Sequence, residues 1–544
     1  MKPMPVLHTH RGAPDWLTWL AVLGLLALAA LSARSALPLD ETRYLGVAWE
    51  MWLRGDFLVP FKNGEPYSHK PPLLFWLIHA GWSVFGPNDW WPRLITPLLA
   101  LVNTWLTWCL ARRFWPDADT VARIAPLVLL STLMWLVYAQ ALMFDMLVTT
   151  CTLLGLNALA EATRPGNRSA PWWGLFGLAV GLGVLAKGPA ILVHLLPAAL
   201  LAPWWGGISS RGRWYGGLLL ALLLGVALAL AWAVPAGIRG GEAYQQAIFW
   251  GQTANRMVNS FAHKLPFWWY LATLPLFFFP WLAWPGLVRR LVAVVRAGWE
   301  DPGLRFILVW LGSALLTFSA ISGKQPHYIL PEAPALALLI AVALAGADAP
   351  GRPLLPALGL MGLGGALTWL GLQADAAGWT ASLAPWSGAG FVLASLVLLP
   401  RRIPTGNAKW MTWVMLGCLL WLLLVLFPPL SPAFNMRPMA RQLAQLEAGG
   451  HPIAHDGKYH DQYQFAGRLT RPLKELFSPA EVQSWIAAHP DGALVLYFPA
   501  DEDVTSLGPV HVQPYRSGQA ALFMADRAAA ALSRHTAPKD EAEP

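Results

Sequence analysis

Long apolar runs separated by short polar loops make up most of the chain as far as Pro428. Runs of roughly 17–22 apolar residues, enough to cross a bilayer as a helix, can be laid out as about thirteen spans. The runs are rich in Leu and Ala and do not alternate, which favours helices over a β-barrel. The pattern predicts a polytopic α-helical membrane protein whose spans centre near Leu25, Val102, Leu130, Leu153, Val180, Pro197, Leu224, Phe277, Leu311, Leu339, Leu363, Ala394 and Leu423.

A long polar connection, residues 40–91, separates the first two runs. Apolar residues recur in it at helical spacing, which predicts a short amphipathic helix lying on the membrane interface. Asp40 is placed at the N-cap of this helix and Glu41 in its first turn. A second segment, Pro72–Phe85, is apolar but too short for a span, so we expect another interfacial helix there.

The composition changes after Pro428, where charged residues return and Pro and Gly punctuate short units. Residues 1–430 are therefore predicted to form the membrane domain, and residues 431–544 a soluble α/β domain large enough for its own core. The last residues, 538–544, have the composition of a disordered tail. Within the domain we expect helices at Met439–Ala448 and Pro479–Ala488 and strands at Ala493–Phe498 and Ala520–Ala525.

Composition and charge fit this picture. Hydrophobic residues make up 56% of the chain and charged residues 12%, against roughly 25% charged in soluble domains. The three cysteines all lie in apolar runs, so no extramembrane disulfide framework or zinc motif is available. The first run is predicted to be a retained signal anchor; the alternative is cleavage near Ala33-Arg34-Ser35-Ala36.

The net charge of +8 comes largely from basic loops beside the apolar runs, so it does not call for a nucleic-acid partner. If the N-terminus is cytoplasmic, the basic loops share its side and the loops around Ala141 and Ala377 lie opposite. An odd number of spans then places the C-terminal domain outside the cytoplasm. The basic residues are Lys2 and Arg11; Arg112, Arg113 and Arg123; Arg164 and Arg168; Arg211 and Arg213; Arg289, Arg290, Arg296 and Arg305; Arg352; and Arg401, Arg402 and Lys409.

Ionisable and aromatic polar residues collect on the outer face, where cations outnumber carboxylates. This mixture suits an anionic substrate whose headgroup lies at the interface. They are Asp40, Glu41, Arg43, Glu65, His69, Lys70, Arg93, Asp145, Lys187, Arg256, His263, Lys264, Lys324, His327 and Tyr328.

Simpler roles remain open for several of these residues. Lys187 and Lys324 stand beside glycines at span ends, where free amides and a cation can hold a phosphate, or the lysines can snorkel to headgroups. Asp40 can act only as a helix cap, and Asp145 can be a buried charge paired with an arginine. His194 lies within a span and is expected to be structural.

Five motifs occur in an order that resembles the lipid-linked glycosyltransferases of the GT-C fold. More narrowly, the set resembles the bacterial branch containing the 4-amino-4-deoxy-L-arabinose lipid A transferases, which is related to the protein O-mannosyltransferases. The resemblance covers roughly residues 15–430. The motifs are Asp40-Glu41 after the first span; Tyr67-Ser68-His69-Lys70-Pro71-Pro72; Leu185-Ala186-Lys187-Gly188-Pro189; Arg256 with His263-Lys264-Leu265-Pro266-Phe267; and Ser322-Gly323-Lys324 with Tyr328-Ile329-Leu330-Pro331.

The resemblance implies transfer of aminoarabinose from undecaprenyl phosphate to a phosphate of lipid A at the periplasmic face of the inner membrane, a modification that gives resistance to cationic peptides such as polymyxin. Asp40 matches the catalytic acidic residue, and Lys70 and Arg256 match residues that bind the polyprenyl phosphate. Glu41 and Asp145 are further catalytic candidates. Substrate-binding candidates are Arg43, Tyr44, Tyr67, His69, Lys187, His263, Lys324, His327 and Tyr328.

The resemblance requires no cofactor, although a divalent cation at Asp40, Glu41 and His69 is an alternative. Two other functions stay open. One is transfer of another sugar, such as mannose, to protein or glycan. The other is transport of a polyprenyl-linked lipid, for which the chain lacks the inverted repeats common in transporters.

Overall fold

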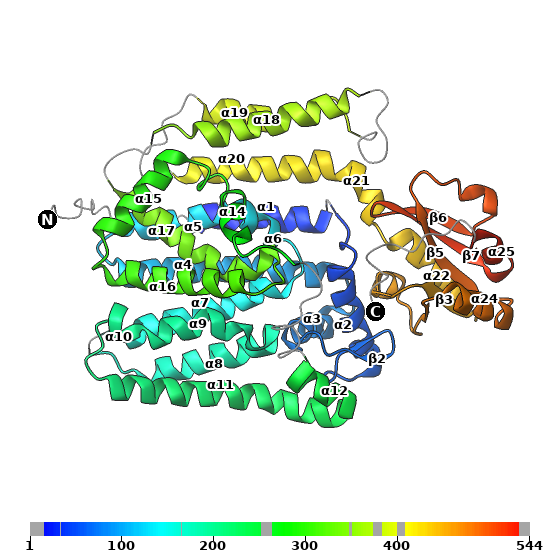
Figure 1. Cartoon of the computed structure of the whole chain (residues 1–544), viewed down its shortest axis with the longest axis horizontal. Coiled ribbons are helices and arrows are strands. Elements are labelled where there is room, and N and C mark those ends of the chain that lie inside the picture. Colours follow the sequence, from blue (N-terminus) through cyan, green and yellow to red (C-terminus); the bar gives the residue numbers. More distant parts are fainter. Residues whose placement is uncertain are drawn as a thin grey trace.

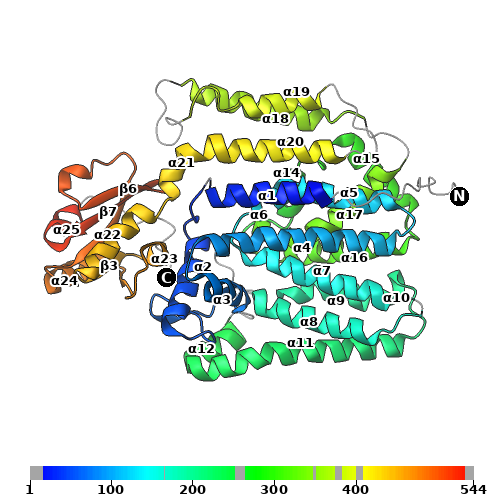
Figure 2. The same ribbon diagram turned by 180° about the vertical axis from the view of Figure 1, so that it is seen from behind.

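The computed structural model describes residues 16–32, 34–164, 166–251, 264–346, 351–373, 383–399 and 408–532. Long helices lie side by side in a bundle, with α11 along one edge and the pair α18 and α19 along the other (Figure 1). A small α/β domain covers one end of the bundle, and the view from behind in Figure 2 places α2 and α3 between the two parts.

The bundle and its connections consist of helices that follow the predicted apolar runs. They are α1 (Trp16–Ser32), α4 (Trp90–Phe114), α5 (Asp119–Leu130), α6 (Leu133–Tyr138), α7 (Phe144–Ala162), α8 (Ala170–Lys187), η1 (Gly188–Ala190), α9 (Ile191–Leu200), α10 (Ala202–Trp205), α11 (Arg211–Gly240), α12 (Glu242–Gln246), η2 (Ala247–Gly251), α14 (Trp269–Phe277), α15 (Pro285–Ala297), α16 (Pro302–Ala320), η3 (Pro326–Glu332), α17 (Ala333–Ala345), α18 (Leu354–Gly371), α19 (Ala389–Leu398), α20 (Ala408–Trp421), η5 (Leu422–Leu426) and α21 (Phe427–Phe434).

Every predicted span centre lies within one of these helices. Seven helical stretches of the described residues are long and apolar enough to cross a membrane, and α1, α3 and α19 are shorter apolar helices. The number of about thirteen spans stays a prediction. Some predicted spans are interrupted, as at Ser131 and Thr132 between α5 and α6.

The chain turns sharply between α8 and α9 at Gly188, which has a φ of 74° that suits glycine. A Cβ on Gly183 would lie 2.3 Å from Cγ1 of Ile191, eight residues later. Eight residues of straight helix span about 12 Å, so α9 must fold back against α8. This turn leaves Lys187 at the end of the bundle that faces the α/β domain.

The first outer loop contains two helices and a short hairpin: α2 (Asp40–Arg54), β1 (Phe61–Lys62), β2 (Glu65–Pro66) and α3 (Leu73–Phe85). Both helices were predicted, but the N-cap assignment of Asp40 is wrong. Leu39 occupies that position with a φ of 77°, and Asp40 is the first helical residue. The Leu37 amide donates instead to Glu41, 2.8 Å away, so the Asp40 side chain is not used as a cap.

The C-terminal part has the predicted α/β fold. A mixed five-stranded sheet has the order β4-β3-β5-β7-β6, with β3 parallel to β4 and β5 and with β7 antiparallel to β5 and β6. The elements are α22 (Arg437–Ala448), β3 (Ile453–Asp456), α23 (Gln464–Gly467), β4 (Lys474–Leu476), α24 (Pro479–Ala488), β5 (Ala493–Pro499), η6 (Thr505–Leu507), β6 (His511–Tyr515), β7 (Gly518–Met524) and α25 (Ala525–Ala531).

The central strand β5 is apolar along its length because both faces of the sheet are covered. Val495 and Tyr497 pack on one side with Leu443 of α22, whereas Leu494 and Leu496 pack on the other with α24 and α25. Such a continuous apolar strand is typical of a sheet between two helical layers. The predicted tail, 538–544, lies outside the described residues.

The α/β domain docks on the first outer loop through several hydrogen bonds. The indole of Trp49 donates to the Leu469 carbonyl at 2.9 Å, and Lys62 Nζ donates to the Tyr459 carbonyl at 2.6 Å. Consequently the apolar face of α2 is covered by protein, and α2 is more than an interfacial helix resting on lipid.

Gly46 of α2 allows this close approach. A Cβ at this position would lie 2.5 Å from Cβ of Asp461. Gly46→Ala is expected to lower the stability of the full chain by about 1–3 kcal/mol, because overpacking outweighs the gain in helix propensity. Thermal unfolding followed by tryptophan fluorescence measures this effect.

Gly24→Ala in α1 is the matched control, because no heavy atom lies within 4 Å of a Cβ there. This variant should be at least as stable as the unmodified chain. Equal unfolding temperatures for the two variants would contradict tight docking at Gly46.

Candidate active site

Asp40 stands at the start of α2 with about half of its side chain exposed. Its Oδ1 lies 3.2 Å from Nη2 of Arg43 and accepts a hydrogen bond from the Tyr44 hydroxyl at 3.3 Å. These residues share one face of α2, because positions i, i+3 and i+4 are neighbours on a helix. The carboxylate is therefore held in place while part of it stays open to a ligand.

A second carboxylate, Asp145 in the first turn of α7, is buried and forms an ion pair with Lys187 at the end of α8. The Lys187 ammonium also lies 4.9 Å from the centre of the Tyr328 ring. Asp145 is therefore a buried, paired charge, as one of the two predicted alternatives held. Its partner is Lys187 and not an arginine. A lysine held this way keeps its charge at a fixed position.

Aromatic rings connect α2 with the loop before α3. Tyr44 packs edge-on against Phe144, 4.9 Å between ring centres, and Lys70 Nζ lies 5.7 Å from the same Phe144 ring. Tyr67 stacks on His69 at 5.3 Å. The predicted residues of the first outer loop thus border the residues of α7.

The two carboxylates belong to one electrostatic cluster. Asp145 lies within electrostatic range of His327, Lys187 and Lys70. His327 interacts with these two lysines and also with Asp40. Most of the outer-face residues chosen from the sequence therefore converge on one site, although they come from five separate segments of the chain.

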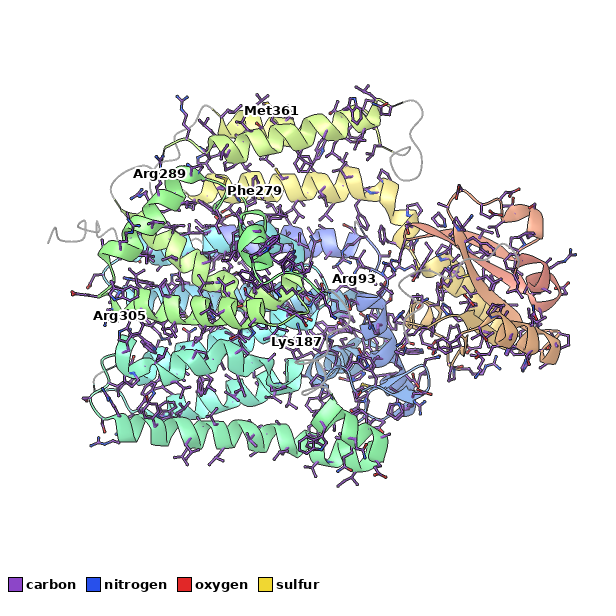
Figure 3. All side chains as sticks on the ribbon, in the orientation of Figure 1. Arg93, Lys187, Phe279, Arg289, Arg305 and Met361 are labelled. Carbon is purple, nitrogen blue, oxygen red and sulfur yellow. The ribbon has the colours of Figure 1, made fainter. Side chains whose placement is uncertain are left out.

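The sidedness predicted from the basic loops is also visible. Figure 3 shows Lys187 toward the end of the bundle that carries the α/β domain, and Arg289 and Arg305 toward the opposite end. The labelled residues of the two predicted classes thus lie toward opposite ends of the helices, and which end faces the cytoplasm stays a prediction.

The catalytic assignment of Glu41 needs correction. Its carboxylate is buried and paired with Arg34, whose Nη2 donates to Oε1 at 2.8 Å. The amides of Leu37 and Leu142 also donate to it, at 2.8 and 2.6 Å. Burial alone would raise the pKa of the Glu41 carboxyl, but Arg34 and the two amides hold that pKa below its ordinary value. All of its acceptor capacity is used inside the protein, so we assign Glu41 a structural role.

Lys324 also lies apart from the cluster. Its ammonium is buried and donates to the carbonyl oxygens of Leu265, at 3.0 Å, and Ile321. The backbone of Lys264 pairs with Gly323 next to it. Lys324 therefore fixes a loop and does not offer its charge to a substrate. Arg256 and His263 lie outside the described residues.

His194 is structural, as expected, because its Nδ1 lies 2.5 Å from Oε1 of Glu332 inside the bundle. Within the described ranges, no group of three or more His, Cys, Asp or Glu side chains could hold a metal ion. Asp40, Glu41 and His69 therefore form no such group among themselves.

Sequence reasoning missed three residues around the site. Arg34 follows the first span and was considered only as part of a cleavage motif, yet it anchors Glu41. Tyr138 packs on His327 at 6.1 Å and Phe144 separates Tyr44 from Lys70. The aromatic residues carried no signal, because a Tyr or Phe at a span end is typical of any membrane helix.

The fold defines the class of this protein: a polytopic α-helical membrane protein with a C-terminal α/β domain. The chain shares its fold with ArnT from Cupriavidus metallidurans. In the apo state of that protein the TM-score is 0.72 at 20% identity, with 94% of this chain and 98% of the other covered. The structure of ArnT bound to undecaprenyl phosphate gives a TM-score of 0.71 at 22% identity over the same shares.

Sequence comparisons lead to particular relatives. The chain is 34% identical over 318 residues to an undecaprenyl phosphate-alpha-4-amino-4-deoxy-L-arabinose arabinosyl transferase of Pseudomonas paraeruginosa, covering 56% of this chain and 55% of the relative. It is 31% identical over 319 residues to the enzyme of the same name from Pectobacterium atrosepticum. The match thus spans about half the length of these curated relatives.

Residues 69–232 also match the family model described as dolichyl-phosphate-mannose-protein mannosyltransferase. These matches confirm the resemblance that the ordered motifs predicted, both to the aminoarabinose transferases and to the related mannosyltransferases.

Proposed function

We propose that this chain is a glycosyltransferase that moves 4-amino-4-deoxy-L-arabinose from undecaprenyl phosphate to a phosphate of lipid A at the periplasmic face of the inner membrane. The observation that carries the proposal is the clustering of Asp40 and Asp145 with Lys70, Lys187 and His327 at one end of the bundle. The relatives named for this reaction support the choice of sugar and carrier.

The reaction is a displacement at the anomeric carbon of the sugar. The bond from that carbon to the polyprenyl phosphate breaks, and a bond to an acceptor oxygen forms. Negative charge grows on the departing phosphate, and a cation held nearby stabilises it most in the transition state. Lys70 is proposed for this task because its Nζ lies 5.7 Å from the centre of the Phe144 ring, which packs against Tyr44. Arg256 is assigned to the same task from sequence alone.

The acceptor decides what Asp40 does. A hydroxyl acceptor needs a general base. A phosphate with a second pKa of about 6 is already a nucleophile at neutral pH. We therefore assign Asp40 to positioning, through the acceptor or the sugar amine. Its bonds to Arg43 and Tyr44 fix its carboxylate for that purpose.

Transfer of another sugar, such as mannose, to protein or glycan is the second candidate, favoured by the family model that matches residues 69–232. Incubating the purified chain with aminoarabinose or mannose on undecaprenyl phosphate, together with both lipid A and an acceptor protein, separates the two. Mass spectrometry of lipid A should show the added pentose. Unmodified lipid A alongside a mannosylated protein would overturn the proposal.

The phosphate assignment is tested by ligand binding. Lys70→Ala is expected to weaken binding of undecaprenyl phosphate about tenfold, the scale of one lost charge-assisted contact. Arg256→Ala should act in the same direction. Microscale thermophoresis of the purified chain in detergent measures both affinities.

Lys474→Ala is the matched control, because Lys474 is exposed on β4 of the α/β domain. It should bind like the unmodified chain. Full affinity in both Lys70→Ala and Arg256→Ala would refute the assignment of a phosphate site to this cluster.

A further inference from the structure

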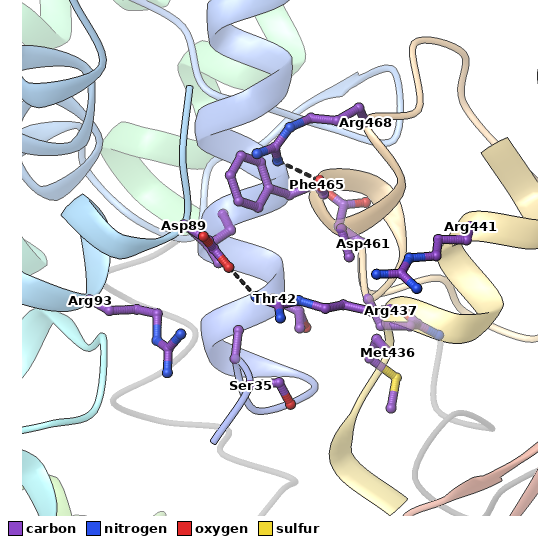
Figure 4. A pocket seen from close by; sticks show the side chains of 14 residues that line it. Ser35, Thr42, Asp89, Arg93, Met436, Arg437, Arg441, Asp461, Phe465 and Arg468 are labelled. Carbon is purple, nitrogen blue, oxygen red and sulfur yellow. Dashed lines mark hydrogen bonds and ion pairs between the residues drawn. The ribbon is translucent and has the colours of Figure 1, made fainter. Parts of the chain in front are cut away.

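A second polar cavity lies on the face of α2 that points away from Asp40. Its volume is about 230 Å³, and it is lined by the segment between α1 and α2, by α2, by the start of α4 and by the α/β domain. Figure 4 shows side chains from both parts of the protein around it. Four arginines and two acids line the cavity: Arg93, Arg437, Arg441, Arg468, Asp89 and Asp461.

Several buried polar atoms of this lining have no hydrogen-bond partner within the described part of the chain. They are Oγ1 of Thr42, Nε of Arg93 and both carboxyl oxygens of Asp461. The three residues are 6%, 3% and 0% exposed. Leaving a buried donor or acceptor unpaired costs about 1–3 kcal/mol, so native proteins rarely keep several together without a ligand or water.

The charge of the lining favours an anion. Arg437 forms an ion pair with Asp89, and Arg468 donates to the Phe465 carbonyl at 2.6 Å (Figure 4). The remaining acid, Asp461, is buried, and burial raises the pKa of its carboxyl well above the ordinary value. This favours its protonated form, which donates to an anion. Arg93 and Arg441 add two further guanidinium groups without a carboxylate partner among the described residues.

Arg437, Arg441 and Arg468 are all exposed, but Arg437 pairs with Asp89 and Arg468 donates to a carbonyl, which leaves Arg441 as the available one. It is exposed on α22, and within the described ranges its guanidinium makes no side-chain ion pair or hydrogen bond. Figure 4 shows it directed toward the centre of the cavity. Arg93 lies opposite, in the first turn of α4, where it also donates to the carbonyls of Ala30 and Arg34.

We propose that this cavity binds a phosphate group between Arg441 of the α/β domain and Arg93 of the membrane domain. Guanidinium forks match phosphate oxygens in geometry and charge. The cavity is smaller than the roughly 300–1,000 Å³ of pockets for drug-sized ligands, which suits one phosphate with little of its carrier. The site stands on α2 opposite the transfer site and does not depend on the proposed function.

The location makes a lipid headgroup one source of the phosphate. Ser35 and Ala36 lie a few residues after the end of α1, and Arg93 lies in the first turn of α4, so the cavity is close to the ends of two apolar helices. Free phosphate is the other source. In either case the α/β domain contributes Arg441 and much of the cavity lining, so it would take part in binding the phosphate.

Binding is tested with inorganic phosphate and with a short-chain phosphatidic acid, in a chain that already carries Lys70→Ala so that the transfer site contributes little. Adding Arg441→Gln to the Lys70→Ala chain is expected to reduce its affinity for phosphate or phosphatidic acid about tenfold. Arg441→Lys should restore part of it. Arg527→Gln is the matched control, because Arg527 is exposed on α25 and lies outside the cavity lining.

The two probes separate the sources. A loss with both probes assigns the site to phosphate itself, and a loss confined to phosphatidic acid assigns it to a lipid headgroup. Unchanged affinity of Arg441→Gln for both probes, or an equal loss in Arg527→Gln, overturns the proposal. Arg441→Gln in the otherwise unmodified chain should keep its affinity for undecaprenyl phosphate, so failure here leaves the proposed transfer site untouched.

Discussion

Asparagine in place of Asp40 is expected to slow sugar transfer about a hundredfold, the scale of the loss when reacting groups are no longer held in position. The amide keeps the size of the side chain but loses the charge that Arg43 and Tyr44 hold in place. About half of the Asp40 side chain is exposed, so the fold does not depend on its charge. The thermal unfolding temperature should therefore stay the same.

Mass spectrometry of lipid A after incubation with purified donor and acceptor measures the rate. Asp526→Asn is the matched control, because Asp526 is an exposed acid on α25 of the α/β domain. It should transfer sugar at the normal rate. An Asp40→Asn chain that does the same would remove Asp40 from the mechanism.

The variant also distinguishes positioning from base catalysis. If Asp40 positions the acceptor, Asp40→Glu retains the charge with a longer arm and should keep part of the activity at all pH values. If Asp40 were the base, residual transfer by Asp40→Asn should rise with pH as hydroxide replaces it. We expect residual transfer that is independent of pH above about 7, because a lipid phosphate with a second pKa of about 6 is fully ionised there.

The sequence predicted much of this architecture because local signals determine it. Apolar length places the bundle helices, and every predicted span centre lies in a helix. Helical spacing predicted α2, and composition predicted the α/β fold after Pro428. The outer-face cluster was also predictable, because span order and the positive-inside rule place Asp40, Lys70 and Lys187 at one end.

The pairings within the site could not be predicted, because they join distant residues without a local pattern. Lys187 meets Asp145 across 42 positions, and the Arg34 side chain reaches the Gln140 carbonyl across 106. The sequence alone could not separate the buried Glu41 from the open Asp40, since both stand in one dipeptide. The two stand next to each other in α2, so their side chains leave the helix in different directions, and the packing around α2 decides which one is buried.

The docking of the α/β domain on α2 could not be predicted from the sequence either. The need for glycine at position 46 becomes clear only from the structure, in which Asp461 lies against it. The arginines of α22 and Arg93 of α4 likewise become one feature only when the domain covers α2. The sequence separated the chain into two domains, but their interface is a property of the folded molecule.

Glutamine in place of Glu41 is expected to destabilise the chain by about 3 kcal/mol, because it leaves Arg34 as a buried charge without its counterion. Arg34 would keep its hydrogen bond to the Gln140 carbonyl at 2.6 Å, but the two bonds to a charged partner would be lost or weakened. Intrinsic fluorescence of the 32 tryptophans follows thermal unfolding. Glu242→Gln, on the exposed part of α12, is the matched control and should unfold normally.

The pH dependence of this loss identifies the ion pair as its cause. The pKa of Glu41 in the folded chain lies below its ordinary value of 4.5, so its contribution is fully present above about pH 4.5 and is lost as the pH falls through the folded value. The difference in free energy of unfolding between the unmodified chain and Glu41→Gln should therefore be constant from neutral pH to about 5. It should become smaller in stronger acid. Adding Arg34→Met to Glu41→Gln should recover part of the stability, because the stranded charge is removed. A gap that persists unchanged in acid, or a double variant less stable than Glu41→Gln, would show that Glu41 supports the fold by packing rather than by charge.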